Sequence, residues 1–143
     1  MIKVIDFKKE HLQALLEQPL YQHLKSNISE AHMEDLEKKR NAYTCMTEDG
    51  RILIVAGVTE YWKGRGEAWA LFDRESKKDL LLIHRAVRRF LEICPVRRIE
   101  ATVDVDSETQ HRWIKSLGFE MEAPRLRKFT SEGKDASLYV RIR

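Results

Sequence analysis

One long amphipathic helix, set between two strand-like runs, constrains the fold of this chain most. The stretch KKDLLLIHRAVRRFLEIC (residues 77–94) repeats apolar side chains along one helical face, and Pro95 stops it. These apolar residues are Leu80, Ile83, Val87, Phe90, Leu91 and Cys94. The run EAWALFDR precedes the helix and RIEATVDV follows it. A strand, a crossover helix and a second strand form a right-handed unit, so the sequence predicts one parallel pair of strands.

The other segments predict antiparallel pairing. Two strand-like runs flank Asp49-Gly50, a residue pair that favours a two-residue hairpin turn. A second turn, KGRGE, extends this hairpin to a three-stranded meander over residues 42–74. The remaining expected elements are a strand at 2–6, a helix at 7–18 ended by Pro19, a helix at 29–40 capped by Ser29, a strand at 97–106, a helix at 107–118, and an antiparallel pair at 119–125 and 136–143. The predicted order is β-α-α-β-β-β-α-β-α-β-β, an α/β mixed and mostly antiparallel sheet in a single domain over residues 1–143.

The stretch HRWIKSLGFE joins a helix directly to a strand. Ser107 is the expected N-cap of this helix, because its hydroxyl can accept a hydrogen bond from the first turn. Gly118 is the expected C′ residue, since glycine takes the left-handed conformation without a Cβ penalty. Phe119 then begins a strand with its side chain in the core. The helix residues expected to point inward are Trp113, Ile114 and Leu117.

Composition narrows the class of protein. The chain has 143 residues, of which 43% are hydrophobic and 34% charged, as in ordinary globular domains. Neither a secretion signal nor an apolar run long enough to cross a bilayer is present, so we expect a cytoplasmic protein. Cys45 and Cys94 are expected to be reduced core thiols, with a disulfide as the alternative. No His, Cys or carboxylate pair has metal-site spacing, and no nucleophile motif occurs.

A nucleic-acid partner is not expected, although several arginines gather on the long helix and at its exit. These are Arg85, Arg88, Arg89, Arg97 and Arg98. The 26 basic residues are nearly balanced by 23 acidic ones, which gives a net charge of only +3. No exposed aromatic platform for bases is expected either.

The element order and the junction SETQHRWIKSLGFE resemble the GNAT acetyltransferase family, in which a helix ending in a Gly-Phe pair leads into the next strand. A closer resemblance is to a bacteriophage branch of this fold, the internal virion protein A family of short-tailed phages. The stretches that carry it are WALFD (residues 69–73), LLLIHRAVRRFL (80–91) and VDVDSETQHRWIKSLGFE (103–120). If it is a phage protein, we expect it in the host cytoplasm or in the virion.

The GNAT resemblance implies acetyl-CoA as the cofactor. The pantetheine arm would pair with the strand residues Leu71, Phe72 and Asp73, and the pyrophosphate would lie on the turn at residues 74–79. The side chains expected to supply positive charge there are Arg74, Lys77 and Lys78. Ser107 is a further candidate for cofactor binding, because it stands where an Asn is common at the start of the later helix. The turn RESKKDL lacks the glycines of active members, which let a backbone approach phosphate closely. The three basic residues also fit a solvated helix start.

The resemblance also implies an acid and a base. A tyrosine that protonates the departing thiolate in many GNAT enzymes is replaced by Ile114, which has no proton to donate. Our candidates for the general base are Asp73 first and Asp104 second, because both lie at the C-terminal ends of the parallel strands, where ligands bind in such sheets. Glu67 and Glu100 lie on the same strands, and each of the four also fits a surface carboxylate.

Two functions remain open. The first is an acetyl-CoA-dependent N-acetyltransferase that acts on the amine of a small molecule or of a protein. The second is a GNAT-fold phage protein without catalysis, which would bind virion or host proteins. The glycine-free turn and the missing tyrosine favour the second function, and the fold favours the first.

Overall fold

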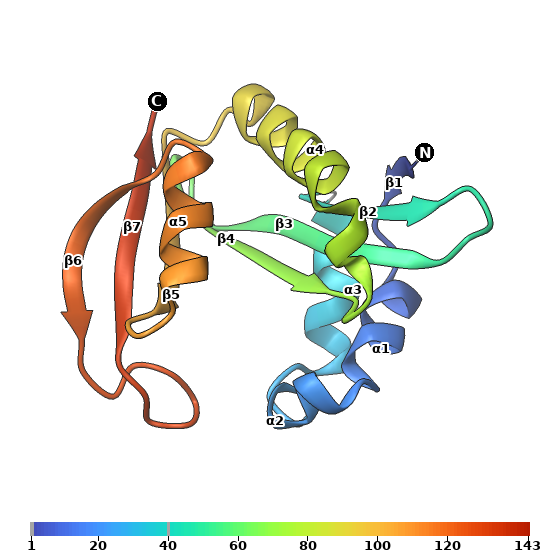
Figure 1. Cartoon of the computed structure of the whole chain (residues 1–143), viewed down its shortest axis with the longest axis horizontal. Coiled ribbons are helices and arrows are strands. Elements are labelled where there is room, and N and C mark those ends of the chain that lie inside the picture. The colour runs from blue at the N-terminus through green and yellow to red at the C-terminus, as the bar shows by residue number, and fades with distance from the viewer. Residues whose placement is uncertain (1, 40) are drawn as a thin grey trace. The chain divides into compact units, whose positions relative to one another are not determined.

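A computed structural model describes residues 2–39 and 41–143 of the chain (Figure 1). Its seven strands form one sheet in the order β1-β2-β3-β4-β5-β7-β6. The strands are β1 Ile2–Asp6, β2 Ala42–Thr47, β3 Ile52–Trp62, β4 Arg65–Phe72, β5 Arg98–Asp104, β6 Glu120–Leu126 and β7 Ala136–Ile142. The helices are α1 Lys9–Leu16, η1 Pro19–Tyr21, α2 Gln22–Lys25, α3 Glu30–Lys39, η2 Ser76–Asp79, α4 Leu80–Ile93 and α5 Glu108–Ser116. The predicted fold class, an α/β mixed sheet with β4 and β5 as a parallel pair, is confirmed.

The described chain divides into two compact units. The first unit contains residues up to Thr59 together with Trp69–Phe90, and the second contains Glu60–Ala68 and Leu91–Arg143. Each is described by itself below. The expectation of a single domain stays a prediction.

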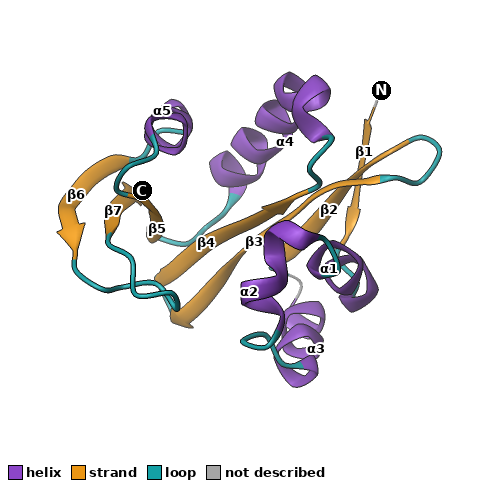
Figure 2. Cartoon of the chain, turned by 60° about the horizontal axis from the view of Figure 1, so that its bottom comes forward, coloured by secondary structure: helices purple, strands orange, loops and turns teal. Residues whose placement is uncertain are grey.

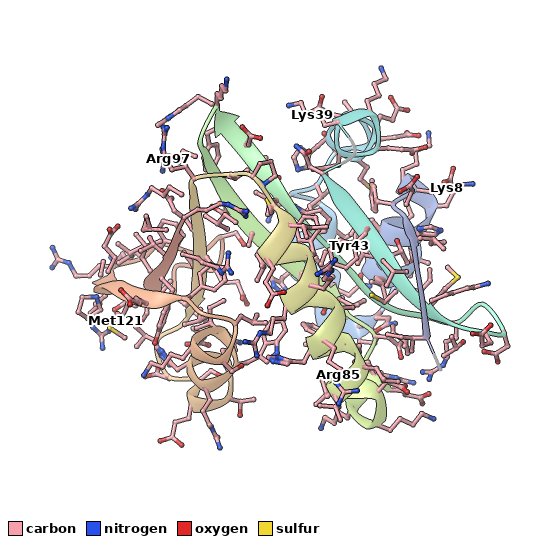
Figure 3. The ribbon with its side chains drawn as sticks, turned by 90° about the horizontal axis from the view of Figure 1, so that it is seen from above. Lys8, Lys39, Tyr43, Arg85, Arg97 and Met121 are labelled. Carbon is pink, nitrogen blue, oxygen red and sulfur yellow. The ribbon has the colours of Figure 1, made fainter. Side chains whose placement is uncertain are left out.

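In the first unit, helices cover both faces of the strands. Figure 2 shows α1, α2 and α3 on one face and α4 on the other. The core under the N-terminal helices contains Phe7, Leu12, Leu15, Leu16, Met33, Leu36, Ala42, Val55 and Leu71. On the other face, Tyr43 of β2, which is labelled in Figure 3, packs against Phe90 of α4. The two ring centroids are 4.8 Å apart. Because the buried residues of α1 and α3 belong to the same core cluster, both helices pack against the same face of the sheet.

Three details of the first unit differ from the sequence predictions. The hairpin turn has Glu48 and Asp49 at its centre, since the Gly50 N–H donates to the Thr47 carbonyl at 3.0 Å. Gly50 follows as the left-handed residue, with φ 91°. Pro19 does not end α1, which stops at Leu16, but begins the short helix η1.

The third difference concerns Leu80, which was predicted to be part of the apolar stripe but is 48% exposed. A helical side chain covers the turn before its own Cα, and for Leu80 that turn is η2 rather than a strand. The rest of the stripe is buried or half-buried.

On α3, the Ser29 hydroxyl accepts from the His32 N–H at 3.1 Å, which confirms the predicted cap. The last residue of the predicted helix, Arg40, lies outside the described residues.

In the second unit, β7 pairs antiparallel with both β5 and β6, as expected for the closing strands (Figure 1). The α5 caps are confirmed. The Ser107 hydroxyl accepts from the Gln110 N–H at 3.2 Å, and Gly118 has φ 91°. The Gly118 N–H donates to Lys115 at 3.0 Å and the Phe119 N–H to Ile114 at 3.4 Å, the two bonds of a Schellman motif.

The parallel register that joins β4 to β5 runs over Arg65–Glu67 and Arg98–Glu100. Glu100 is 7% exposed and accepts from both neighbouring guanidinium groups, Arg65 Nε at 2.6 Å and Arg98 Nε at 2.8 Å. These charged hydrogen bonds lower the pKa of Glu100, chiefly through Arg65 and secondly through Arg98, against the opposing effect of burial. Glu100 is therefore a structural group of the parallel pair.

Candidate functional site

The end of β4 and the turn before α4 hold most of the predicted site residues. Leu71 is buried, and Phe72 is the last residue of the strand. The Asp73 N–H donates to the Leu53 carbonyl of β3 at 2.9 Å. Because backbone groups alternate along a strand, the N–H and C=O of Phe72 point to the opposite edge. This edge, at Phe72, is called the β4 edge below.

One side chain, Tyr21, occupies the β4 edge. Its hydroxyl accepts from the Phe72 N–H at 2.7 Å and donates to the Phe72 carbonyl at 3.0 Å. Tyr21 ends the short helix η1. Burial raises the pKa of its hydroxyl, so the proton needed for donation is present at neutral pH. A single hydroxyl thus forms the two bonds that a neighbouring strand would form with one residue.

The Asp73 carboxylate organises the turn. Its Oδ1 accepts from Gln18 Nε2 at 2.6 Å, and its Oδ2 accepts from the Glu75 N–H at 3.0 Å. Arg51 Nη1 also lies 3.4 Å from Oδ2, and the Asp73 side chain is only 16% exposed. Gln18 accepts in turn from the Arg74 N–H at 3.3 Å. The candidate base is therefore held by donors from three separate segments.

The predicted pyrophosphate turn folds into the 3-10 helix η2. Ser76 is buried, and its N–H donates to the Asp73 carbonyl at 3.0 Å. Asp79 Oδ2 lies 3.6 Å from Arg51 Nη2, beyond hydrogen-bond distance but close enough for ionic attraction. The exposed basic side chains of the turn are Arg74, Lys77 and Lys78. The N–H groups of residues 74–76 thus donate to acceptors of the chain itself, and the positive charges face solvent.

The other two predicted residues, Asp104 and Ser107, lie in the second unit. The Asp104 Oδ1 accepts from the Asp106 N–H at 3.1 Å, and its backbone N–H donates to Gln110 Oε1 at 2.8 Å. The Ser107 hydroxyl is the N-cap described above. Both side chains therefore shape the loop from β5 into α5. His111 is a satisfied histidine, with Nε2 3.0 Å from the Val105 carbonyl and Nδ1 2.7 Å from the hydroxyl of the buried Tyr139.

An exposed aromatic group, not expected from the sequence, lies on the β3–β4 hairpin. Tyr61 and Trp62 are 50% and 60% exposed, and the Arg65 guanidinium lies over both rings. The Tyr61 hydroxyl donates to Glu67 at 2.7 Å, which, with partial burial, raises its pKa to about 12. The expectation of no exposed aromatic platform was wrong. The Arg65 guanidinium beside these rings is paired with Glu100.

Three further observations concern the described residues. Cys45 and Cys94 are free and buried, as expected, and burial raises the pKa of the Cys45 thiol to about 11. Over residues 2–39 and 41–143, no cluster of His, Cys, Asp and Glu could hold a metal ion. In the same part of the chain, no helix has the length and apolar character needed to cross a membrane.

Sequence reasoning missed Tyr21, Gln18 and Arg51. Gln18 was predicted only as the last residue of a helix, and Tyr21 lies after Pro19, where the sequence predicted no element. Arg51 follows a hairpin turn. Each meets the end of β4 across a long separation in the chain, and no local pattern encodes such a contact.

Comparison with solved structures identifies the fold as that of the GNAT acetyltransferases. A GNAT-family acetyltransferase from Streptococcus pneumoniae matches with a TM-score of 0.72 and 15% identity, over 99% of this chain and 99% of that chain. The ribosomal-protein-S5-alanine acetyltransferase from Vibrio fischeri matches with a TM-score of 0.69 and 15% identity, over 99% and 92%. The spermidine N-acetyltransferase from Vibrio cholerae, in complex with CoA and spermine, matches with a TM-score of 0.67 and 14% identity, over 99% and 95%. No protein-family model and no curated protein matches the sequence.

Proposed function

We propose that this protein is an acetyl-CoA-dependent N-acetyltransferase that acts on an amine, and that it binds the cofactor through a modified pyrophosphate turn. The observation that carries the proposal is the β4 edge. The N–H and C=O of Phe72 point together away from β3 and form bonds to a side chain. An amide-bearing arm needs this pair of groups, and the strand leads directly into the turn and α4. The GNAT fold of the solved acetyltransferases supports the same reading.

The reaction would move an acetyl group from sulfur to nitrogen. Bound acetyl-CoA would supply the acetyl group as a thioester with the CoA thiol as its leaving group, and a carboxylate of the chain would take the proton that the amine loses. Asp73 and Asp104 are the proposed bases. As a base, Asp73 would take the proton on a carboxylate that Gln18 and Arg51 also contact. Acetyl transfer lost in Asp73→Asn or Asp104→Asn, with CoA binding retained, would assign the role.

Side-chain charge would replace the missing glycines at the turn. The N–H groups of Arg74, Glu75 and Ser76 are already bonded within the chain, so they fit a pyrophosphate poorly. The exposed side chains of Arg74, Lys77 and Lys78 fit it better, because each can reach a phosphate oxygen from solvent. We also propose Ser107 as a cofactor contact, although its hydroxyl now caps α5.

The second candidate is a GNAT-fold protein without catalysis, which would bind phage or host proteins in the host cytoplasm or the virion. Two observations favour it. The turn satisfies its own N–H groups, and Ile114, at the place of the acid, is a buried core residue. A small-molecule or protein amine would then not be a substrate.

Isothermal titration of the whole protein with CoA and with acetyl-CoA tests the cofactor binding that the acetyltransferase requires. An acetyltransferase gives saturable heat with both ligands. Absence of heat and of a thermal shift at millimolar ligand would exclude the acetyltransferase and leave the second candidate. A titration with ATP serves as a control for nonspecific attraction to the basic side chains.

A further inference from the structure

We propose that Tyr21 is a latch that closes the β4 edge, so that the segment Gln18–Lys25 must move before the pantetheine arm can pair with Phe72. The inference rests on the proposed function, because the cofactor is the ligand that the latch would exclude. It assigns to this segment control over cofactor access at the same site.

The latch follows from the hydrogen-bonding capacity of one strand residue. Along the β4 edge, Phe72 offers one N–H and one C=O, and Tyr21 takes both, at 2.7 Å and 3.0 Å. An added strand or a pantetheine amide would need the same two groups. The hydroxyl and the arm therefore compete for Phe72.

A second contact holds the same segment against the turn. The Gln18 side chain donates to Asp73 at 2.6 Å and accepts from the Arg74 N–H at 3.3 Å. Gln18 precedes η1 and Tyr21 ends it, and together they bind three consecutive residues, Phe72 at the end of β4 and Asp73 and Arg74 after it. Both contacts must break together if the segment is to leave.

The segment itself is suited to movement. It contains the 3-10 helix η1 and the four-residue helix α2, each too short to be stable alone. Leu20 is 59% exposed, and no residue of η1 or α2 is fully buried. Tyr21 and Leu24 pack against the core as partly buried side chains, so opening would uncover part of the core surface but no fully buried residue of η1 or α2.

Isothermal titration with CoA tests the latch through Tyr21→Phe, which keeps the ring and removes the hydroxyl. Because a closed population weakens apparent affinity, the loss of these bonds should tighten CoA binding about 5-fold or more relative to wild type. Tyr61→Phe is the matched control. It removes another tyrosine hydroxyl, one that bonds Glu67 in the second unit, and should leave the affinity unchanged.

The outcomes separate the latch from the proposed function. If Tyr21→Phe and wild type bind CoA equally well, or the variant binds more weakly, the latch is wrong and the proposed function stands. If neither binds CoA, the proposed function fails and the latch fails with it. Gln18→Ala is a second variant that leaves Phe72 and its tyrosine partner intact. It should also tighten binding, and unchanged affinity in this variant likewise overturns the latch.

Discussion

Replacing Gly118 by alanine should destabilise the protein through one backbone conformation. Gly118 has φ 91°, where a residue with a Cβ costs about 1–2 kcal/mol. The added Cβ would lie 3.4 Å from Arg141 Nε, and that guanidinium is held by its bond to the Leu91 carbonyl at 3.0 Å. Because 3.4 Å is an ordinary van der Waals distance, steric contact adds little even to a fixed guanidinium, and the conformational cost dominates. We expect Gly118→Ala to lower the free energy of unfolding by about 1–2 kcal/mol.

Urea unfolding at neutral pH measures this cost. With a typical dependence on denaturant, the midpoint should fall by about 1 M without a change in slope. Gly118→Asn is the matched control, because asparagine enters the left-handed region more readily and should cost less. A Gly118→Ala protein as stable as wild type, or an asparagine variant that loses as much, would refute the role assigned to the Schellman motif.

Two further predictions concern the sheet. Gly57→Ala should lower the free energy of unfolding by about 3 kcal/mol, because the new Cβ would lie 2.5 Å from the Asn41 carbonyl oxygen and 2.8 Å from the Ala42 Cα, both backbone atoms. Thermal unfolding of the variant checks this, and an unchanged melting temperature contradicts it. Acid should weaken the parallel pair through Glu100. Since its folded pKa is lowered, its stabilisation is present above its ordinary value of 4.5 and is lost as pH falls through the lower folded value. Glu100→Gln should be less stable at neutral pH and should lose this part of the acid dependence, and an unaltered pH profile would exclude the mechanism.

Local rules predicted much of the fold. The long apolar stripe, the Ser107 cap and the Gly118 stop each depend on neighbours within a few residues, so the sequence alone was sufficient. The same rules failed where geometry beyond the element decides. Leu80 belongs to the stripe by spacing, but it begins α4 after a 3-10 turn. The hairpin turn shifted by one residue because Gly50, not Asp49, takes the left-handed conformation.

The sequence predicted the strand end and the turn of the candidate site, but not the side chains that contact them. The end of β4 was placed correctly as a strand leading into a helix, but its partners were not visible in the sequence. Tyr21 meets Phe72 across 51 residues and Gln18 meets Asp73 across 55. Such contacts depend on how the N-terminal helices pack on the sheet, and that packing is set by the whole core.

Assigned backbone amide spectra of the protein, recorded with and without CoA, test the central claim most directly. The account predicts that CoA perturbs the amides of Leu71, Phe72 and Asp73 and those of the turn up to Asp79. It also predicts that Phe72 exchanges its Tyr21 partner for the ligand, with perturbation of Tyr21 itself. Spectra in which CoA leaves this stretch unchanged, or perturbs only other parts of the chain, would contradict the account.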